Sequence, residues 1–371
     1  MKRLRYVMIG GFLGAGKTTT VARLARRYRD QGLRVGIVTN DQAFGLVDTL
    51  SLRAQGFDVG EVTGACFCCK FNDLIDTVRE LSSEERPDVI LAEPVGSCTD
   101  LAATVLEPLR HFYSDEVELA PLAVVLKPEH GAKILDGAGD VGFSPKAAYI
   151  FLKQLEEADV VAVNKIDKLA PSETSRLVEL IRNRFPGKTV LAYSARTGER
   201  FEELAAAIDR AETPRTRTPE MDYDVYAEGE AELGWLNCTV NLRAARDDRP
   251  FELDRVAIEF VERLAQACNR NGVEPAHVKV MGATSDAAAV ANWVCSTTPA
   301  ELSLSSAAST ESASLTVNAR AAVAPETLTE LVRQVAAELA ATHALEHDVV
   351  DMQSFRPGRP MPTHRMALGQ G

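Results

Sequence analysis

Up to about residue 210, short continuous apolar runs alternate with stretches in which apolar residues recur at helical spacing. Continuous apolar runs are typical of strands that are buried on both faces of a parallel sheet. Helical spacing is found, for example, at 18–29, 152–157, 172–185 and 201–208. The pattern predicts an α/β domain, a mostly parallel sheet with helices on both faces, with strands at 6–9, 34–39, 87–92, 122–126, 158–163 and 189–192.

Beyond a proline- and threonine-rich stretch at 213–219, the apolar pattern changes. Residues 235–243 alternate between apolar and polar, as in a half-buried antiparallel strand. Helices are predicted at 253–270 and 325–344, the second with a capping box of Thr327 and Glu330. The order of elements predicts a smaller α+β domain with helices on one face of its sheet. Its further strands are expected near 278–281, 290–294 and 314–319, and a Ser/Ala-rich loop at 303–314.

With 371 residues, the chain is long enough for two domains. We expect the α/β domain at 1–212, a linker at 213–222, the α+β domain at 223–345 and an irregular tail at 346–371.

The composition of the chain limits the classes of function that it can have. The formal charge of −12 argues against non-specific nucleic-acid binding, which needs a basic surface. No apolar stretch reaches the roughly 18 residues of a membrane span. The basic and apolar start imitates a secretory signal but runs directly into a glycine-rich motif, so we interpret it as a strand. We expect a cytoplasmic protein, in which seven cysteines indicate a metal or redox site rather than disulfides.

A complete phosphate-binding P-loop, Gly-x-x-x-x-Gly-Lys-Thr, follows the first predicted strand and opens the first predicted helix. Its glycines let backbone N–H groups converge on phosphate oxygens at a helix N-terminus. Lys17 is expected to reach the β- and γ-phosphates, and the Thr18 hydroxyl to bind Mg²⁺. The predicted phosphate-binding residues are Gly11, Gly14, Ala15, Gly16, Lys17, Thr18 and Thr19.

The tetrapeptide Asn164-Lys165-Ile166-Asp167 follows the fifth predicted strand and indicates guanine as the base. A carboxylate at Asp167 can accept hydrogen bonds from both N1–H and N2–H of guanine, whereas adenine would leave it unpaired. Ser194 and Ala195, after the sixth strand, are the expected place for a second base contact.

Acidic residues at strand ends are candidates for magnesium chemistry. Glu93 ends the third predicted strand, where a carboxylate can hold Mg²⁺ through water or orient the attacking water. Asp41 and Asp48 lie in the loop after the second strand, a natural position for a switch that senses the γ-phosphate.

Cys66, Cys68 and Cys69 place three thiols within four residues. Thiolates suit Zn²⁺ or Cu⁺ and, with mixed ligands, Co²⁺ or Ni²⁺; three ligands leave one position open for exchange. Buried structural cysteines are the plainer alternative. Redox chemistry is another, although the C-x-x-C spacing of dithiol oxidoreductases is absent here. The candidates for a fourth ligand are Asp41, Asp48, Cys98 and His111.

Together, the P-loop, the Cys66–Cys69 segment, the Glu93–Gly96 segment and Asn164–Asp167 resemble the CobW-like metallochaperone GTPases in order and spacing. These are relatives of the GTPases that insert nickel into urease and hydrogenase. The resemblance covers about 5–210 strongly and the C-terminal part more loosely. It implies weak GTP hydrolysis, with Lys17 and Glu93 as catalytic residues, coupled to metal binding at the three thiols. Asp41 stands where the family has Glu, and no histidine-rich stretch is present.

The leading hypothesis is therefore a GTP-hydrolysing metallochaperone that uses GTP, Mg²⁺ and Zn²⁺ or Co²⁺, with iron also open. It would deliver metal to a client metalloenzyme or corrinoid-related protein, and a homodimer is left open. One alternative is a regulatory GTP-binding docking module with a structural zinc. A redox-sensing GTPase is a third.

Overall fold

The computed structural model describes residues 3–82, 86–137, 143–211, 218–246 and 249–368. The chain divides into two compact units. Unit 1 comprises 1–42, 56–229 and 359–371, and unit 2 comprises 43–55 and 230–358. The units differ from the expected consecutive domains in several segments. Segment 223–229, expected in the α+β domain, belongs to unit 1, and segment 346–358, expected in the tail, belongs to unit 2. Segment 43–55 belongs with the C-terminal part of the chain, and segment 359–371 with the N-terminal part.

Unit 1 contains an eight-stranded sheet in which all the described pairings are parallel. The strand order is β3-β2-β4-β1-β6-β7-β8, with β5 also paired to β1. Its strands are β1 (Leu4–Gly10), β2 (Val35–Asp41), β3 (Asp58–Thr63), β4 (Val89–Glu93), β5 (Val117–Leu119), β6 (Ala123–Leu126), β7 (Val160–Val163) and β8 (Thr189–Ala192). Since β2, β4 and β6 are buried throughout, their continuous apolar runs reflect coverage on both faces.

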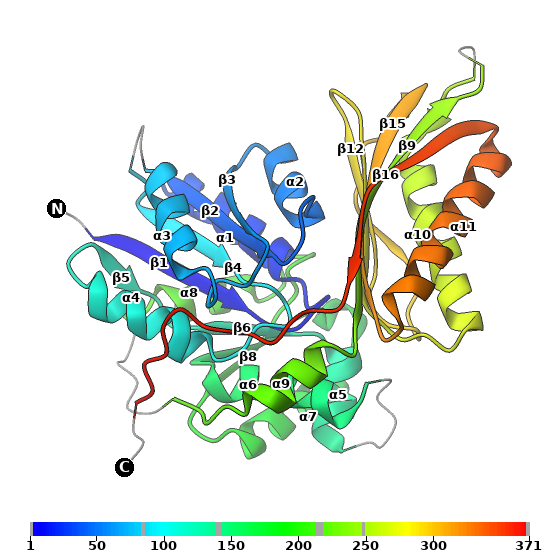
Figure 1. The fold of residues 1–371 in the computed structure, drawn as a ribbon. Helices are drawn as coiled ribbons and strands as arrows, with labels where there is room; N and C mark the ends of the chain where they lie inside the picture. The colour runs from blue at the N-terminus through cyan, green and yellow to red at the C-terminus, as the bar shows by residue number, and fades with distance from the viewer. Residues whose placement is uncertain (1–2, 83–85, 138–142, 212–217, 247–248, 369–371) are drawn as a thin grey trace. The chain divides into compact units, whose positions relative to one another are not determined.

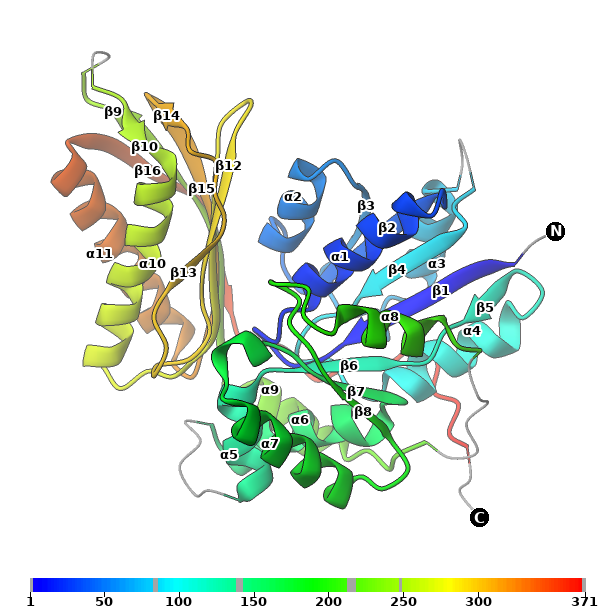
Figure 2. The same ribbon diagram turned by 180° about the vertical axis from the view of Figure 1, so that it is seen from behind.

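Helices cover both faces of this sheet; Figure 1 shows α3 against one face, and Figure 2 shows α1 and α8 against the other. The helices are α1 (Lys17–Asp30), α3 (Phe71–Glu80), α4 (Glu107–Phe112), α5 (Pro128–Asp136), α6 (Pro145–Glu157), α7 (Pro171–Arg184), α8 (Phe201–Asp209) and α9 (Tyr223–Glu230). A π-helical turn at Ala102–Leu106 precedes α4, and a 3₁₀ turn occupies Ile166–Lys168. Val21, Leu24 and Tyr28 form the buried stripe that fixes α1 on the sheet.

Unit 2 contains a six-stranded antiparallel sheet in the order β13-β12-β11-β15-β9-β16. Figure 1 shows α10 (Leu253–Arg270) and α11 (Pro325–His343) on one face. A separate pair, β10 (Phe251–Glu252) and β14 (Ser309–Thr310), is short. The strands of the sheet are β9 (Gly234–Ala244), β11 (Pro275–Ala283), β12 (Ala288–Trp293), β13 (Glu301–Leu304), β15 (Ser312–Ala321) and β16 (Leu345–Phe355).

The two faces of the unit 2 sheet have different partners because side chains alternate along a strand. Val278 and Val280 of β11 belong to the main core beneath α10 and α11. Met281 belongs to a smaller cluster with Val47, which lies on α2 (Val47–Ala54). A helix from the first part of the sequence therefore covers part of the second face of this sheet.

The expected fold, a P-loop α/β domain followed by an α+β domain, is confirmed. The prediction of an irregular tail from 346 was wrong, because β16 occupies Leu345–Phe355 as an edge strand beside β9. The capping box was also wrong: Ala324 is the N-cap of α11, so Thr327 lies inside the helix.

Other local differences from the predictions lie at 303–314 and at β3 (Asp58–Thr63). The predicted loop at 303–314 contains β14 and the ends of β13 and β15. Strand β3 was not expected, since it lies at the sheet edge and lacks a continuous apolar run. Residues 213–217, half of the predicted linker at 213–222, lie outside the described residues. Among the helices of the described residues, none is long and apolar enough to cross a membrane.

Candidate functional site

The P-loop joins the end of β1 to the start of α1 and adopts a glycine-dependent conformation. Gly11, Gly14 and Gly16 have φ angles of 132°, 73° and 93°, in the region that side chains disfavour. A Cβ at Gly16 would also lie 2.4 Å from Nδ2 of Asn164. The Lys17 ammonium is buried and donates to the Gly11 carbonyl at 3.0 Å, so it is held back over its own loop.

Thr18 and Glu93 meet at the carboxyl ends of neighbouring strands. Strand β4 pairs with β1 in parallel, which brings the buried Glu93 carboxylate to the start of α1. The Thr18 hydroxyl donates to Glu93 Oε1 at 3.0 Å. A hydroxyl beside a carboxylate is an oxygen donor set of the type that Mg²⁺ prefers, so the residues fit the ion that the P-loop implies. Thr18 would bind it directly and Glu93 through water.

Asn164 braces three loops rather than standing open to solvent. Its Nδ2 donates to the Ala15 carbonyl at 2.9 Å. Its Oδ1 accepts from the backbone N–H groups of Lys165 and Ala195, at 2.8 and 2.9 Å. The P-loop, the Asn164–Asp167 turn and the Ser194–Ala195 turn are therefore fixed together by one buried amide.

The Asp167 carboxylate lies beside the Ser194–Ala195 turn, as the sequence predicts for a base-reading site. It accepts from Ser194 Oγ and from the Arg196 guanidinium, each at 2.6 Å. Although burial opposes ionisation, these contacts hold the pKa of Asp167 below its usual range. An ionised carboxylate with fixed orientation is the acceptor that guanine requires.

Replacing Asp167 with Asn is expected to shift the base preference from guanine to xanthine, because one acceptor oxygen becomes a donor. A buried mismatch of this kind should cost GTP at least about 100-fold in kcat/KM relative to XTP. Competition between the two nucleotides measures the shift. Asp136→Asn, which removes a surface carboxylate paired with Arg176, is the matched control. An unchanged preference for GTP in Asp167→Asn contradicts the base assignment.

The three predicted metal-ligating cysteines lie in the turn between β3 and α3. The Cys66 carbonyl accepts from the N–H groups of Cys69 and Lys70, each at 3.0 Å. Asn40, at the end of β2, holds the same turn. Its Nδ2 donates to the carbonyls of Val62 and Ala65, and its Oδ1 accepts from Phe67 N–H, all at 2.8 Å.

The sulfur atoms of Cys66, Cys68 and Cys69 lie within 4.8 Å of one another. Cys66 and Cys68 are buried and Cys69 is partly exposed. Hydrogen bonds from Cys68, Cys69 and Cys98 lower the pKa of the Cys66 thiol well below its usual range. The hydrogen bond to Cys66 raises the pKa of Cys69 to about 11. Three sulfur donors held this close together form a preformed soft-donor site.

The candidates for a fourth ligand have different surroundings. Cys98 is a hydrogen-bonding neighbour of Cys66. Asp48 is in unit 2 and forms an ion pair with Lys279. Asp41 caps the end of β2, where its carboxylate accepts from Gln42 N–H at 2.7 Å. His111 is exposed on α4 and stacks edge-on with Phe112.

Comparison with known proteins decides the family. The model of the CobW/HypB/UreG nucleotide-binding domain matches residues 5–192, just over half of the chain. The chain belongs to this family. Members of the CobW/HypB/UreG family are GTPases, and the P-loop, Asn164–Asp167 and the cysteine turn all lie within the matched residues.

Two curated relatives and one solved structure are similar to parts of the chain or to most of it. The urease accessory protein UreG of Metallosphaera sedula is 27% identical over 219 residues, covering 55% of this chain and 92% of UreG. The zinc chaperone YeiR of Escherichia coli is 29% identical over 178 residues, covering 46% of this chain and 49% of YeiR. The structure of Zn(II)-bound YjiA GTPase from E. coli has a TM-score of 0.40 and 14% identity, covering 90% of this chain and 99% of YjiA. The chain thus spans nearly all of UreG but about half of YeiR.

In this CobW/HypB/UreG-family chain, the segment after β2 is clamped to the sheet of unit 2. Asn318 of β15 accepts from Val47 N–H at 2.7 Å and donates to the Gly45 carbonyl at 2.9 Å. Asn237 of β9 donates to the Phe44 carbonyl at 2.8 Å. The segment predicted to sense the γ-phosphate is therefore bound by side chains of the C-terminal domain.

Replacing Asn318 with Ala is expected to release segment 43–55, because two hydrogen bonds are lost. At about 1 kcal/mol each, amide exchange at Val47 should accelerate about 10- to 30-fold. Hydrogen exchange resolved to 43–55 measures this. Asn292→Ala is the control, since it removes a side-chain bond to Ser303 on the same sheet. Equal protection of Val47 in wild type and Asn318→Ala contradicts the clamp.

Sequence reasoning missed Asn40, Asn237 and Asn318 as functional residues. Asn40 ends a predicted strand on the side where parallel sheets carry their sites, and that position was a usable signal. Asn237 and Asn318 occupy polar positions of alternating strands, which also suits ordinary surface residues. Nothing in their sequence neighbourhood indicates that they bind a segment nearly 200 residues or more away.

Proposed function

We propose that this protein is a GTP-hydrolysing metallochaperone that couples its nucleotide state to binding of Zn²⁺ or Co²⁺ at Cys66, Cys68 and Cys69. One observation carries the proposal: three sulfur atoms within 4.8 Å of one another lie inside a P-loop GTPase unit. Soft thiolates suit both metals, and three ligands permit exchange better than a closed site of four. A relative named as a zinc chaperone supports zinc as the first candidate.

A physical connection between nucleotide and thiols is provided by the end of β2. Asn40 is bonded to three backbone groups of the cysteine turn, and Asp41 follows it directly. The chain then enters the segment that Asn318 holds in unit 2. A change in this segment on γ-phosphate loss would be transmitted through Asn40 to the backbone that carries the sulfurs. A shared two-state element of this kind is what coupling between two sites requires.

For hydrolysis, Lys17 would stabilise the charge that develops on the phosphates, and Glu93 would orient the attacking water or the hydrated magnesium. We expect slow intrinsic turnover, consistent with a switch rather than a metabolic enzyme. The receiving protein would be a client metalloenzyme or a corrinoid-related protein. We also propose that the protein works in the cytoplasm, where thiols stay reduced.

The test is a titration of reduced, metal-free protein with Co²⁺, followed by thiolate–metal absorption, in a non-hydrolysable GTP analogue and in GDP. We expect the two affinities to differ by at least about 5-fold, the lower end of ordinary allosteric coupling. Tight metal binding with the same affinity in both nucleotides favours the alternative function, a docking module with a structural zinc. The hydrogen bond between Asn318 and segment 43–55 is the observation that supports this alternative. Absence of thiolate–metal absorption rejects both.

A further inference from the structure

The loop after β4, residues 93–100 and hereafter the relay loop, touches the nucleotide site at its start. Glu93 accepts from the Thr18 hydroxyl. Three residues later, Gly96 packs against the P-loop so closely that a Cβ there would lie 3.0 Å from the Cα of Leu13. Any side chain at 96 would push the two loops apart. The relay loop is therefore in direct backbone contact with the segment that binds phosphate.

The same loop reaches the thiol cluster at Cys98. This thiol is 1% exposed and is a hydrogen-bonding neighbour of the Cys66 sulfur. It also interacts electrostatically with Cys68. Its backbone is held from α6, where Gln154 Nε2 donates to the carbonyls of Gly96 and Cys98, at 3.0 and 2.8 Å. The thiol is thus presented to the cluster by a braced, buried backbone.

We infer that Cys98 is the fourth ligand of the metal carried by Cys66, Cys68 and Cys69, and that the relay loop links its position to the nucleotide. This inference rests on the proposed function. The Cys98 sulfur neighbours that of Cys66 but does not lie within 4.8 Å of all three cluster sulfurs, so it would move inward to complete the four ligands of a tetrahedral metal. Each thiol that binds gives up its proton to water, and the sulfur donates its electron pair to the metal. Cys98 is only five residues from Glu93, so nucleotide-driven movement there alters how closely a fourth sulfur can approach.

The experiment compares Cys98→Ala with wild type in the same Co²⁺ titrations, using Cys238→Ala, a buried cysteine of unit 2, as control. We expect Cys98→Ala to lose at least one thiolate–cobalt equivalent of charge-transfer absorption and about 100-fold in affinity. Its affinity should also become less dependent on the nucleotide. An unchanged spectrum and affinity in Cys98→Ala, with wild type binding normally, overturns the inference and leaves the proposed function intact. Failure of wild type to bind cobalt rejects the proposed function itself.

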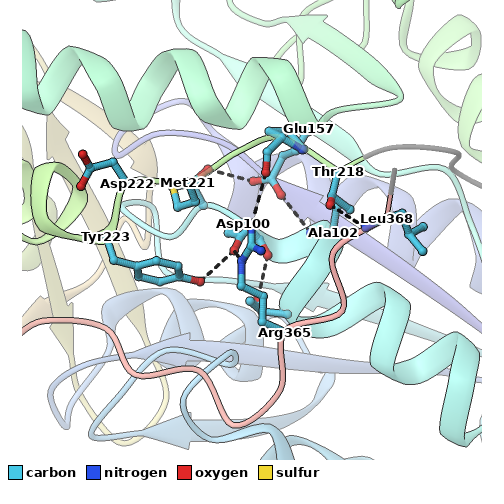
Figure 3. Close-up of polar contacts among 12 residues, drawn as sticks. Asp100, Ala102, Glu157, Thr218, Met221, Asp222, Tyr223, Arg365 and Leu368 are labelled. Carbon is cyan, nitrogen blue, oxygen red and sulfur yellow. Dashed lines mark hydrogen bonds and ion pairs between the residues drawn. The ribbon is translucent and has the colours of Figure 1, made fainter. Parts of the chain in front are cut away.

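A second inference comes from independent contacts of the C-terminal segment 359–368, hereafter the strap. Figure 3 shows its anchor, where the Arg365 guanidinium meets the buried Asp100 carboxylate. Arg365 Nε donates to Asp100 Oδ2 at 2.7 Å, and the Tyr223 hydroxyl donates to the same oxygen at 2.7 Å. Leu368 and Thr218 exchange two further hydrogen bonds. The end of the strap is therefore tied to the rest of unit 1 by an ion pair whose carboxylate is buried.

Upstream of this anchor, the strap contacts the backbone of the cysteines themselves. Thr363 N–H donates to the Cys68 carbonyl at 2.8 Å, and its hydroxyl donates to the Cys69 carbonyl at 2.9 Å. Met361 N–H donates to the Cys69 sulfur at 3.2 Å. Pro360 and Pro362 alternate with these donors, so the extended backbone is partly fixed before it binds. The two backbone N–H groups of residues 360–363 therefore both donate to the turn that carries the cysteines.

We propose that the strap positions Cys68 and Cys69 and retards release of the metal until it is lifted. It acts through the backbone of the ligating residues, so it is a positioning element and leaves GTP chemistry untouched. Like the first inference, it rests on the proposed function. Because Asp100 ends the relay loop, the anchor and the fourth-ligand candidate lie two residues apart.

Release of Co²⁺ from loaded protein to excess chelator, followed by stopped-flow absorption, tests the strap. Arg365→Ala removes the anchor, and Thr363→Pro removes the N–H that bonds Cys68. We expect both to release cobalt at least about 10-fold faster than wild type, with Arg365→Lys intermediate and GTP turnover unchanged. Arg176→Ala, which breaks the surface pair with Asp136, is the control. Wild-type release rates in both Arg365→Ala and Thr363→Pro overturn the proposal, whereas wild type that takes up no cobalt rejects the proposed function.

Discussion

Replacing Lys17 with alanine is expected to abolish GTP turnover while leaving the fold intact. Lys17 is the one P-loop side chain that can place a positive charge against the β- and γ-phosphates. Its ammonium is buried and donates to the Gly11 carbonyl, so it is held over the loop in which the phosphates would bind. Loss of a preorganised donor of this kind costs about 100- to 1,000-fold in rate.

The measurement is kcat/KM for GTP in the purified variant, together with its thermal unfolding. Lys188→Ala removes a lysine that donates to a surface carbonyl of α6, and it should keep wild-type turnover. The Lys17 variant should unfold within about 4 °C of wild type, the shift expected for about 1 kcal/mol. Turnover near the wild-type level in a folded Lys17→Ala protein means that hydrolysis does not occur at this P-loop.

Replacing Cys66 with alanine is expected to have the second large effect, the loss of metal binding. Cys66 is buried at the centre of the thiol cluster, and its sulfur contacts those of both Cys68 and Cys69. A cysteine-bound zinc contributes about 10–16 kcal/mol over four ligands, or about 3 kcal/mol per ligand. Removing one should therefore weaken binding at least about 100-fold.

Zn²⁺ affinity by chelator competition gives the measurement, and GTP binding in the same preparation shows whether the nucleotide site survives. Cys268→Ala, in the core of unit 2, is the matched control because it removes a buried thiol away from the cluster. Wild-type Zn²⁺ affinity in Cys66→Ala would place the metal elsewhere and remove the basis for a thiolate carrier.

Local sequence was sufficient to predict that the motifs of the candidate nucleotide site lie close together, because each is a contiguous motif at the end of a buried strand. The P-loop, Glu93 and the Asn164–Asp167 turn are brought together by parallel pairing, which the apolar runs predict. The Asn164–Asp167 turn after β7 and the Ser194–Ala195 turn after β8 likewise meet because those strands are neighbours. All of these motifs follow the carboxyl ends of parallel strands, where the binding sites of open α/β sheets lie.

The parts that could not be predicted all depend on contacts between segments far apart in sequence. Arg365 of the strap and Asp100 are 265 residues apart, and Asn318 and Val47 are 271 apart. Such pairs have no periodicity, and each residue alone reads as a polar surface position. The edge strand β16 was missed for a related reason, since its charged, half-exposed sequence lacks the apolar alternation of an internal strand.

The most direct test of the central claim is a closed thermodynamic cycle on wild-type protein. Zn²⁺ affinity is measured with the GTP analogue and with GDP, and the affinities of both nucleotides are measured with and without Zn²⁺. One factor is the ratio of the Zn²⁺ affinities measured with the analogue and with GDP. The other is the change that Zn²⁺ causes in the preference for the analogue over GDP. If nucleotide and metal act on one switch, the two factors must be equal. We predict equal factors of at least about 5. Factors of one on both sides would contradict a GTP-gated metal carrier.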